Sequence, residues 1–217
     1  MINSAIPYAC LSATEYLKGV MFAVFAAYQG AAEAATWILL WKVWCLIEIV
    51  PECIASAATV RVEHNLSQGD LTIAKMVARR SLVVCTISSI FFSTLLMVTR
   101  QVFAWSLSLD ETLQQMIIEV IPYIALCQPF ITAGVSADYL NGTLGRYSTS
   151  VGISTLIDVC FTIPLAAMFT YIVGFNLEGL ASAMCIGYAV TSVTNLVIFS
   201  ETDWQYAAKK VQEYTEE

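Results

Sequence analysis

Carboxylates stand out among the residues that could do chemistry, because several lie inside long apolar stretches of the sequence. They are Glu15, Glu48, Glu52, Asp138 and Asp158. An ionisable group at hydrocarbon depth is costly, so its presence indicates a functional site by default. A carboxylate in a water-lined cavity can bind and release a proton or a cation, which is the chemistry of ion-coupled transport. We therefore predict Glu15, Glu48, Asp138 and Asp158 as residues that bind a substrate or an ion.

Local spacing gives three of these carboxylates a defined setting. Glu15 and Lys18 are three residues apart, so they share a helical face and can form an ion pair. Glu48 and Glu52 are four residues apart, share a face and bracket Pro51. Because proline has no N–H and frees a backbone carbonyl one turn earlier, polar backbone is expected where the two carboxylates lie.

Each carboxylate also has a purely structural interpretation. Glu15 and Lys18 can simply neutralise one another. Glu48 and Glu52 can lie near the membrane surface, where they are solvated. Asp138 stands close to a polar stretch, which favours a solvated helix end over a deep site. Asp158 is the deepest by position, and a cavity-facing role and a hydrogen bond to a neighbouring helix fit the sequence equally well.

Signatures of enzymes are missing from the sequence. It contains no G-x-S-x-G, no H-E-x-x-H and no G-x-x-x-x-G-K-[ST]. The single histidine, His64, lies in a polar stretch that we predict to be a solvated loop, and the seven cysteines include no C-x-x-C pair. We expect no catalytic residues, no metal site and no cofactor other than H⁺ or Na⁺ as a coupling ion.

The elements that must position these residues are membrane spans. Hydrophobic residues make up 58% of the chain and charged residues 12%, with a mean hydropathy of +0.71. A bilayer span needs about 20 mostly apolar residues. Six segments satisfy that length, at 4–28, 31–60, 72–103, 113–141, 148–173 and 177–199. We predict an all-α membrane protein whose residues 1–200 form a bundle of six transmembrane helices, with neighbours antiparallel because their connections are short.

Basic residues predict the orientation of this bundle. Of those that flank a connection or lie in the polar stretch 201–217, seven fall after the second and fourth segments or in that stretch, and one falls on the opposite side: Arg61, Lys75, Arg79, Arg80, Arg146, Lys209 and Lys210 against Arg100. The positive-inside rule then places 201–217 in the cytoplasm as a tail, and leaves the sequons at Asn65 and Asn141 unglycosylated. Trp37, Trp41 and Trp44 share a face near the outer end of the second segment, which is typical of an interfacial aromatic belt.

Charge and hydropathy together restrict the partners. The net charge of −7 and the pI near 4.7 argue against nucleic acid. We therefore expect membrane lipid to surround the bundle and a small molecule to be its ligand.

Three stretches of the chain resemble the multidrug and toxin extrusion (MATE) family. In 49–70, a proline-containing span leads into a motif similar to the family's V-R-V-x-N-x-L-G-x-G. The residues that fit it are Val60, Arg61, Val62, Asn65 and Gly69. The stretch 141–190 is similar to the fifth and sixth spans of the family's C-terminal lobe, and 203–210 resembles the D-W-x-x-x-A-x-K ending of eukaryotic members.

The resemblance implies a fold and an activity. Members have two six-helix bundles that face a central cavity, and this sequence is similar to the second bundle, or half of a twelve-helix transporter. It implies a partner, either a second six-helix lobe or a homodimer. The implied function is antiport, in which an organic cation, xenobiotic or metabolite leaves as H⁺ or Na⁺ enters, across a plasma or vacuolar membrane.

Glu15 lies near the start of a stretch that resembles the family's E-W-W-like acidic motif, with Tyr16 and Leu17 in place of the aromatic pair. The resemblance implies that Glu15 binds the coupling ion or the substrate. Phe22, Phe25 and Tyr123 would offer planar cations a π-rich surface, unless they are lipid-facing or packing residues.

Two alternatives stay open from the sequence. One is a non-transporting, truncated lobe that acts as a membrane assembly partner. The other is a lipid-linked oligosaccharide flippase of related fold, although such proteins favour more basic cavities than the acidic intramembrane residues here would form.

Overall fold

The computed structural model describes residues 2–209, with side chains from Ala13 onward, and this part of the chain is almost entirely helical. Four long helices come first: α1 (Ile2–Gln29), α2 (Ala31–Ser67), α3 (Leu71–Leu107) and α4 (Glu111–Thr143). A fifth, unbroken run consists of α5 (Tyr147–Ile157), the π-helix η1 (Asp158–Thr162), α6 (Ile163–Met168) and the π-helix η2 (Phe169–Val173). The last long helix is α7 (Leu177–Ser200).

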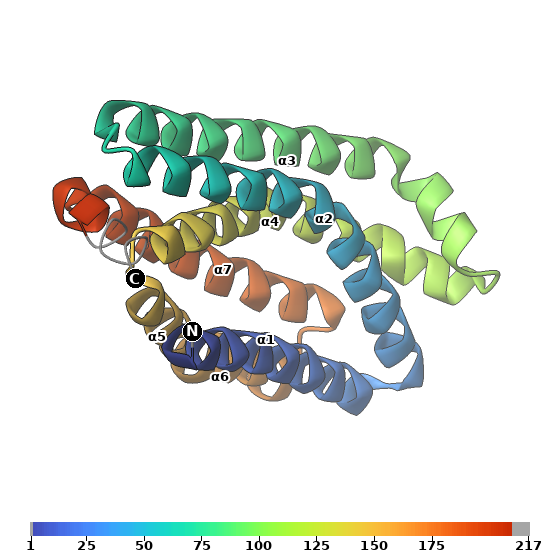
Figure 1. The fold of residues 1–217 in the computed structure, drawn as a ribbon. Helices are drawn as coiled ribbons and strands as arrows, with labels where there is room; N and C mark the ends of the chain where they lie inside the picture. Colours follow the sequence, from blue (N-terminus) through green and yellow to red (C-terminus); the bar gives the residue numbers. More distant parts are fainter. Residues whose placement is uncertain (1, 210–217) are drawn as a thin grey trace.

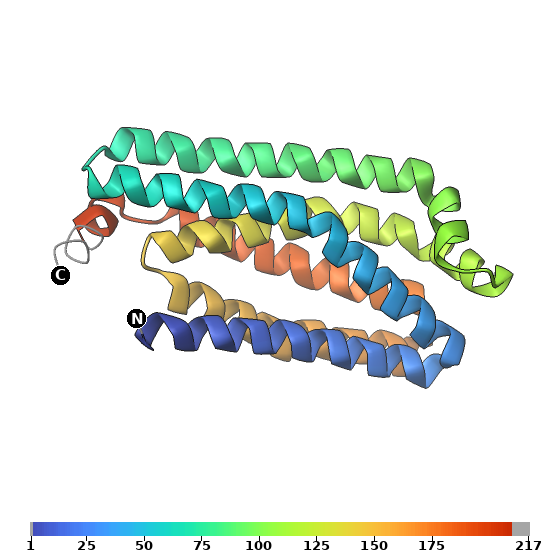
Figure 2. The same cartoon turned by 45° about the vertical axis from the view of Figure 1, so that its right-hand side comes forward.

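The helices lie side by side as an elongated bundle (Figures 1 and 2). Helices α2 and α3 form one side, α1 and the run from α5 to η2 form the other, and α4 and α7 lie between them. Helix α2 changes direction along its length and so passes from the α1 side to the α3 side. Pro51 lies inside this helix, and an interior proline is a common cause of such a bend.

All six predicted segments are helical, but their connections are shorter than the sequence suggested. The polar stretch 63–70 was predicted to be a loop, whereas α2 continues through Ser67 and leaves only 68–70. The helix ends where Gly69 adopts a left-handed φ of 81°, which a residue with a Cβ rarely adopts. His64 therefore lies in the last turn of α2, and its predicted place in a loop is wrong.

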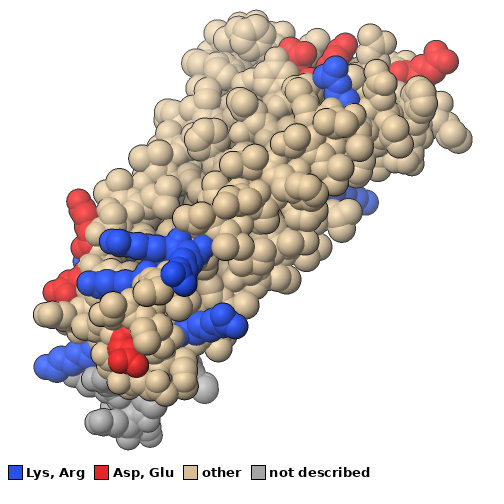
Figure 3. Space-filling model, turned by 90° about the horizontal axis from the view of Figure 1, so that it is seen from above, with Lys and Arg blue, Asp and Glu red and all other residues tan. Residues whose placement is uncertain are grey.

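Many large apolar side chains lie on the surface of the bundle. Four helical runs in the described part are long and apolar enough to cross a membrane: 71–107, 111–143, 147–173 and 177–200. On the face seen in Figure 3, charged side chains gather at the two ends of the molecule, and the length between them is almost uncharged. The chain is thus an integral, multi-pass membrane protein.

The predicted tryptophan belt is wrong for two of its three members. Trp37 is only 2% exposed and stacks on Phe22, with ring centroids 5.7 Å apart. Trp44 is 5% exposed and packs on Tyr188 at 5.4 Å. These rings face the interior because α1 and α7 cover that side of α2, which a pattern on one helix cannot reveal.

A cluster of apolar residues closes one end of the bundle. It joins the ends of α2, α4 and α7 to the start of α3 and to the first residues after α7: Val62, Leu66, Ala74, Ala78, Leu140, Leu144, Phe199, Trp204, Ala207 and Ala208. The start of the predicted tail 201–217 is therefore packed against the bundle, and residues 210–217 lie outside the described part.

Candidate functional site

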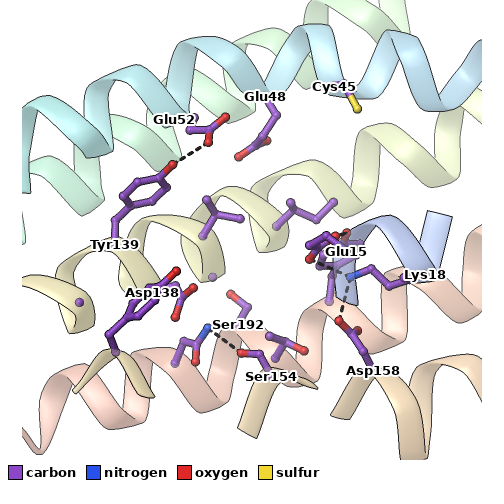
Figure 4. Close-up of a pocket in the computed structure, with 18 of the residues that line it drawn as sticks. Glu15, Lys18, Cys45, Glu48, Glu52, Asp138, Tyr139, Ser154, Asp158 and Ser192 are labelled. Carbon is purple, nitrogen blue, oxygen red and sulfur yellow. Dashed lines mark hydrogen bonds and ion pairs between the residues drawn. The ribbon is translucent and has the colours of Figure 1, made fainter. Parts of the chain in front are cut away.

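A cavity of about 650 Å³ opens between α1, α2, α4, α7 and the α5–η1 run (Figure 4). All four carboxylates that we predicted as binding residues line it, although they come from four separate parts of the chain. The acidic residues of its wall are Glu15, Glu48, Glu52, Glu63, Asp138 and Asp158. Among the described residues that line it, Lys18 is the sole lysine or arginine, so the wall is strongly acidic.

Lys18 joins two of the predicted residues at one end of the cavity. Its Nζ lies 3.0 Å from Glu15 Oε1 and 3.0 Å from Asp158 Oδ2. The same nitrogen lies 4.0 Å from the ring centroid of Tyr188, whose hydroxyl donates to Glu15 Oε2 at 3.2 Å. The Lys18 side chain is 1% exposed, and its charge needs such partners because an unpaired buried charge is costly. We call Glu15, Lys18, Asp158 and Tyr188 the Lys18 cluster.

A break in regular helix geometry presents Asp158 to this cluster. Asp158 is the first residue of η1, and the N–H of Ile163 bonds to the carbonyl of Asp158 instead of the α-helical partner. Short π-helical segments inside α-helices occur frequently at functional sites, because the extra residue re-aims the side chains beside it. Thr162, at the other end of η1, lies against Gly187 of α7 so closely that a Cβ there would overlap it. This contact sets how closely η1 packs against α7.

Glu48 lies farther along the same cavity and is held by α4. Gln128 Nε2 donates to Glu48 Oε2, and Thr132 Oγ1 lies 3.1 Å from the same oxygen. Thr132 Oγ1 is also 3.1 Å from Ser89 Oγ of α3, so three helices meet at this carboxylate. The interpretation of Glu48 as a solvated residue near the membrane surface does not fit these buried partners.

Asp138 belongs to a polar network that crosses three helices. Ser150 Oγ of α5 donates to Asp138 Oδ1 and lies 2.9 Å from Asn195 Oδ1 of α7. Asn141 Nδ2 donates to the carbonyl of Asn195 at 3.1 Å. Asp138 is 9% exposed, so the predicted solvated helix end is wrong. Glu52, in contrast, is exposed within the open part of the cavity, where the hydroxyl of Tyr139 donates to it at 2.6 Å.

The aromatic residues of the cavity differ from those that the sequence suggested. Phe22 and Phe25 are 0% and 5% exposed and belong to the apolar core, so the packing interpretation holds for them. The rings that line the cavity come from α2, α4, α5 and α7: Trp41, Trp44, Tyr139, Tyr147 and Tyr188.

Sequence reasoning missed several polar members of the site. Lys18 was assigned only to a pair with Glu15, and Gln128, Ser150 and Asn195 were not considered. A usable signal existed, because uncharged polar side chains in otherwise apolar spans often hydrogen-bond across helices. Such residues are more numerous in this chain than the site requires, and spacing alone does not select among them.

A bundle of apolar helices around an acidic cavity has the architecture of a membrane transporter. The MatE family model matches residues 7–172, and the chain belongs to this family, whose members are transporters and not enzymes.

The similar proteins agree with this assignment. The chain is 22% identical over 214 residues to Multidrug and toxin extrusion protein 2 of Oryctolagus cuniculus, covering 98% of this chain and 35% of that protein. It is 27% identical over 173 residues to Protein DETOXIFICATION 14 of Arabidopsis thaliana, covering 76% of this chain and 34% of that protein. The chain thus spans about a third of the length of these relatives.

Solved structures show the same fold. The crystal structure of the eukaryotic MATE transporter AtDTX14 matches with a TM-score of 0.92 at 20% identity, over 98% of this chain and 48% of that chain. The crystal structure of MATE in the straight conformation matches with a TM-score of 0.79 at 12% identity, over 98% of this chain and 46% of that chain. The chain therefore corresponds in fold to about half of each solved transporter.

Proposed function

We propose that this chain forms the cation-binding lobe of a secondary active antiporter, which exports organic cations, other xenobiotics or metabolites in exchange for H⁺ or Na⁺. The observation that carries the proposal is the acidic cavity, in which six carboxylates face one lysine. A cleft lined by one sign of charge between apolar walls concentrates ligands of the opposite sign. Cations are thus the ligands that this cavity favours.

The shape of the cavity suits an organic cation. A volume of about 650 Å³ lies within the usual range for drug-sized ligands, roughly 300–1,000 Å³. Trp41, Tyr139 and Tyr147 offer aromatic surface along the same wall as the carboxylates, and aromatic faces attract cations. A planar aromatic cation would therefore find both charge and π surface in one place.

Antiport requires that the exported cation and the coupling ion compete for the same carboxylates. Glu15 and Glu48 line one continuous cavity, so an organic cation that neutralises either residue reduces the attraction for H⁺ or Na⁺. We assign Glu15, Glu48, Asp138 and Asp158 as the binding residues of this exchange.

We further propose that all six long helical segments span the membrane and that the C-terminus is cytoplasmic. Helices α1 and α2 have 28 and 37 residues, which is ample for a bilayer. Lys75 Nζ lies 5.8 Å from the ring centroid of Trp204, so the end of α7 shares one side of the bundle with the basic start of α3. The positive-inside rule makes that side cytoplasmic, in a plasma or vacuolar membrane.

A single lobe would leave its polar cavity next to lipid, which is costly. We therefore propose that the working transporter contains a second six-helix lobe or a second copy of this chain. The related proteins are multidrug and toxin extrusion and detoxification proteins, so the comparisons do not favour the assembly partner or the oligosaccharide flippase.

Uptake of a fluorescent organic cation into vesicles tests the proposal. The full-length native protein is reconstituted, and uptake is driven by a pH gradient or a Na⁺ gradient in separate runs. We expect uptake with one gradient and at least a tenfold loss in Glu48→Gln. Glu119→Gln is the control, because Glu119 lies on α4, the helix that holds Glu48, but does not line the cavity. Wild-type protein that moves no cation with either gradient, or a Glu48→Gln variant as active as wild type, would refute the proposal.

A further inference from the structure

The Lys18 cluster already contains a cation, and that cation is part of the chain. Lys18 Nζ meets an oxygen of Glu15 and an oxygen of Asp158 at 3.0 Å each, and its third side faces the ring of Tyr188 at 4.0 Å. A primary ammonium has three N–H donors. Two carboxylates and an aromatic face therefore account for all three, which is the set of partners that a free ammonium ligand would seek.

The two carboxylates of the cluster differ in access. The side chain of Asp158 is 7% exposed, whereas that of Glu15 is 42% exposed and borders the open cavity (Figure 4). Two carboxylates and one ammonium leave a formal charge of −1, and the accessible part of this charge lies on Glu15. Without Lys18, the same end of the cavity would carry a charge of −2 on two carboxylates that now converge on one nitrogen.

We propose that Lys18 is a specificity-determining residue, which limits this end of the cavity to one monovalent cation and excludes divalent cations. The inference rests on the proposed function, because it concerns which cations the same cavity binds. The physical reason lies in the ligands that hard divalent ions need. Such ions take several carboxylate oxygens. Lys18 occupies the position between the two carboxylates that could supply these oxygens together.

If the ion pairs of Lys18 were purely structural, Lys18 would not determine which cations bind. Lys18 does tie α1 to η1, and a role limited to that tie would affect stability alone. A role in setting the net charge at this end of the cavity affects which cation binds. The discriminating readout is therefore binding of a divalent ion by itself, without transport.

Binding of Mn²⁺ to purified protein provides that readout. The full-length native protein in detergent is titrated with Mn²⁺ alone, and free Mn²⁺ is measured by electron paramagnetic resonance. We expect Lys18→Met to bind one more Mn²⁺ per chain than wild type. Lys18→Arg, which keeps the charge, is expected to match wild type. The double variant Lys18→Met/Asp158→Asn is expected to lose the additional Mn²⁺.

Two results would overturn the inference. One is a Lys18→Met protein that binds no more Mn²⁺ than wild type, and the other is an additional Mn²⁺ that persists after Asp158→Asn. If Lys18→Met is recovered as a folded protein only when Mn²⁺ is present, the inference is supported, because the metal then replaces the lost ammonium. If its recovery and melting temperature do not respond to Mn²⁺, the inference fails. Failure of cation transport by wild type would refute the proposed function and leave this binding result unaffected.

Discussion

Gly187 is the position at which one added methyl group should disturb the site most directly. A Cβ on Gly187 would lie 2.9 Å from Cβ and 2.5 Å from Cγ2 of Thr162, and would also overlap Oγ1. Rotation of the threonine side chain cannot relieve a contact that includes its own Cβ. The Gly187→Ala substitution must therefore push α7 away from η1, the segment that begins with Asp158.

Gly152 provides a matched control for the magnitude. It lies inside α5, and a Cβ there would meet nothing within 4 Å. Alanine is favoured over glycine inside a helix by up to about 1 kcal/mol, and both substitutions have this gain. Overpacking of a tight contact costs about 1–3 kcal/mol, and only Gly187→Ala has this cost. The difference in unfolding free energy between the two variants should thus equal the cost of overpacking, about 1–3 kcal/mol.

Thermal unfolding in detergent micelles, followed by circular dichroism, measures this difference. For a chain of this size, 1 kcal/mol corresponds to about 2–4 °C in melting temperature. We expect Gly187→Ala to melt below Gly152→Ala. Adding Thr162→Ala to the Gly187→Ala protein should restore part of the loss, because this change removes Oγ1 and Cγ2 of Thr162 but keeps its Cβ. A Gly187→Ala protein that melts at or above Gly152→Ala would refute the close packing of α7 on η1.

Three further predictions follow from other parts of the structure. Lys18→Met should lower the unfolding free energy by about 3–5 kcal/mol, because it leaves Asp158 buried without its cation. Lys18→Arg should lower it less, and the melting temperatures of the two variants measure the difference. Trp204→Ala should cost about 3–5 kcal/mol and speed proteolysis after α7, because Trp204 packs on Phe199 at 5.8 Å and is 9% exposed; digestion at the rate of wild type would contradict it. The sequon at Asn65 should carry no glycan, so that an endoglycosidase leaves the gel mobility unchanged; a shift would reverse the proposed orientation.

The positions of the helices were determined by the sequence, because hydropathy and length are local properties. A segment of about 20 apolar residues must satisfy its own backbone hydrogen bonds in a bilayer, and a helix does so without any partner. This is why all six predicted segments are helical. The errors lie at the ends, as at 63–67, where polar residues continue the helix until Gly69 ends it.

The identity of the acidic candidates was also available from the sequence, since a carboxylate inside an apolar segment is costly wherever it points. Glu15, Glu48, Asp138 and Asp158 all line the acidic cavity. The spacing of Glu15 and Lys18 likewise predicted their ion pair, which is confirmed at 3.0 Å.

Only the tertiary structure decided which residues meet across helices. Lys18 and Asp158 are 140 positions apart, and nothing local relates them. The inward direction of Trp37 and Trp44 could not be predicted either. In a soluble helix a polar face marks the outside, but lipid is as apolar as a protein interior, so the periodicity of a membrane helix carries little information on which face packs. The sequence therefore determines that these helices form and that their charges must be sheltered, whereas the packing of the helices decides what shelters each charge.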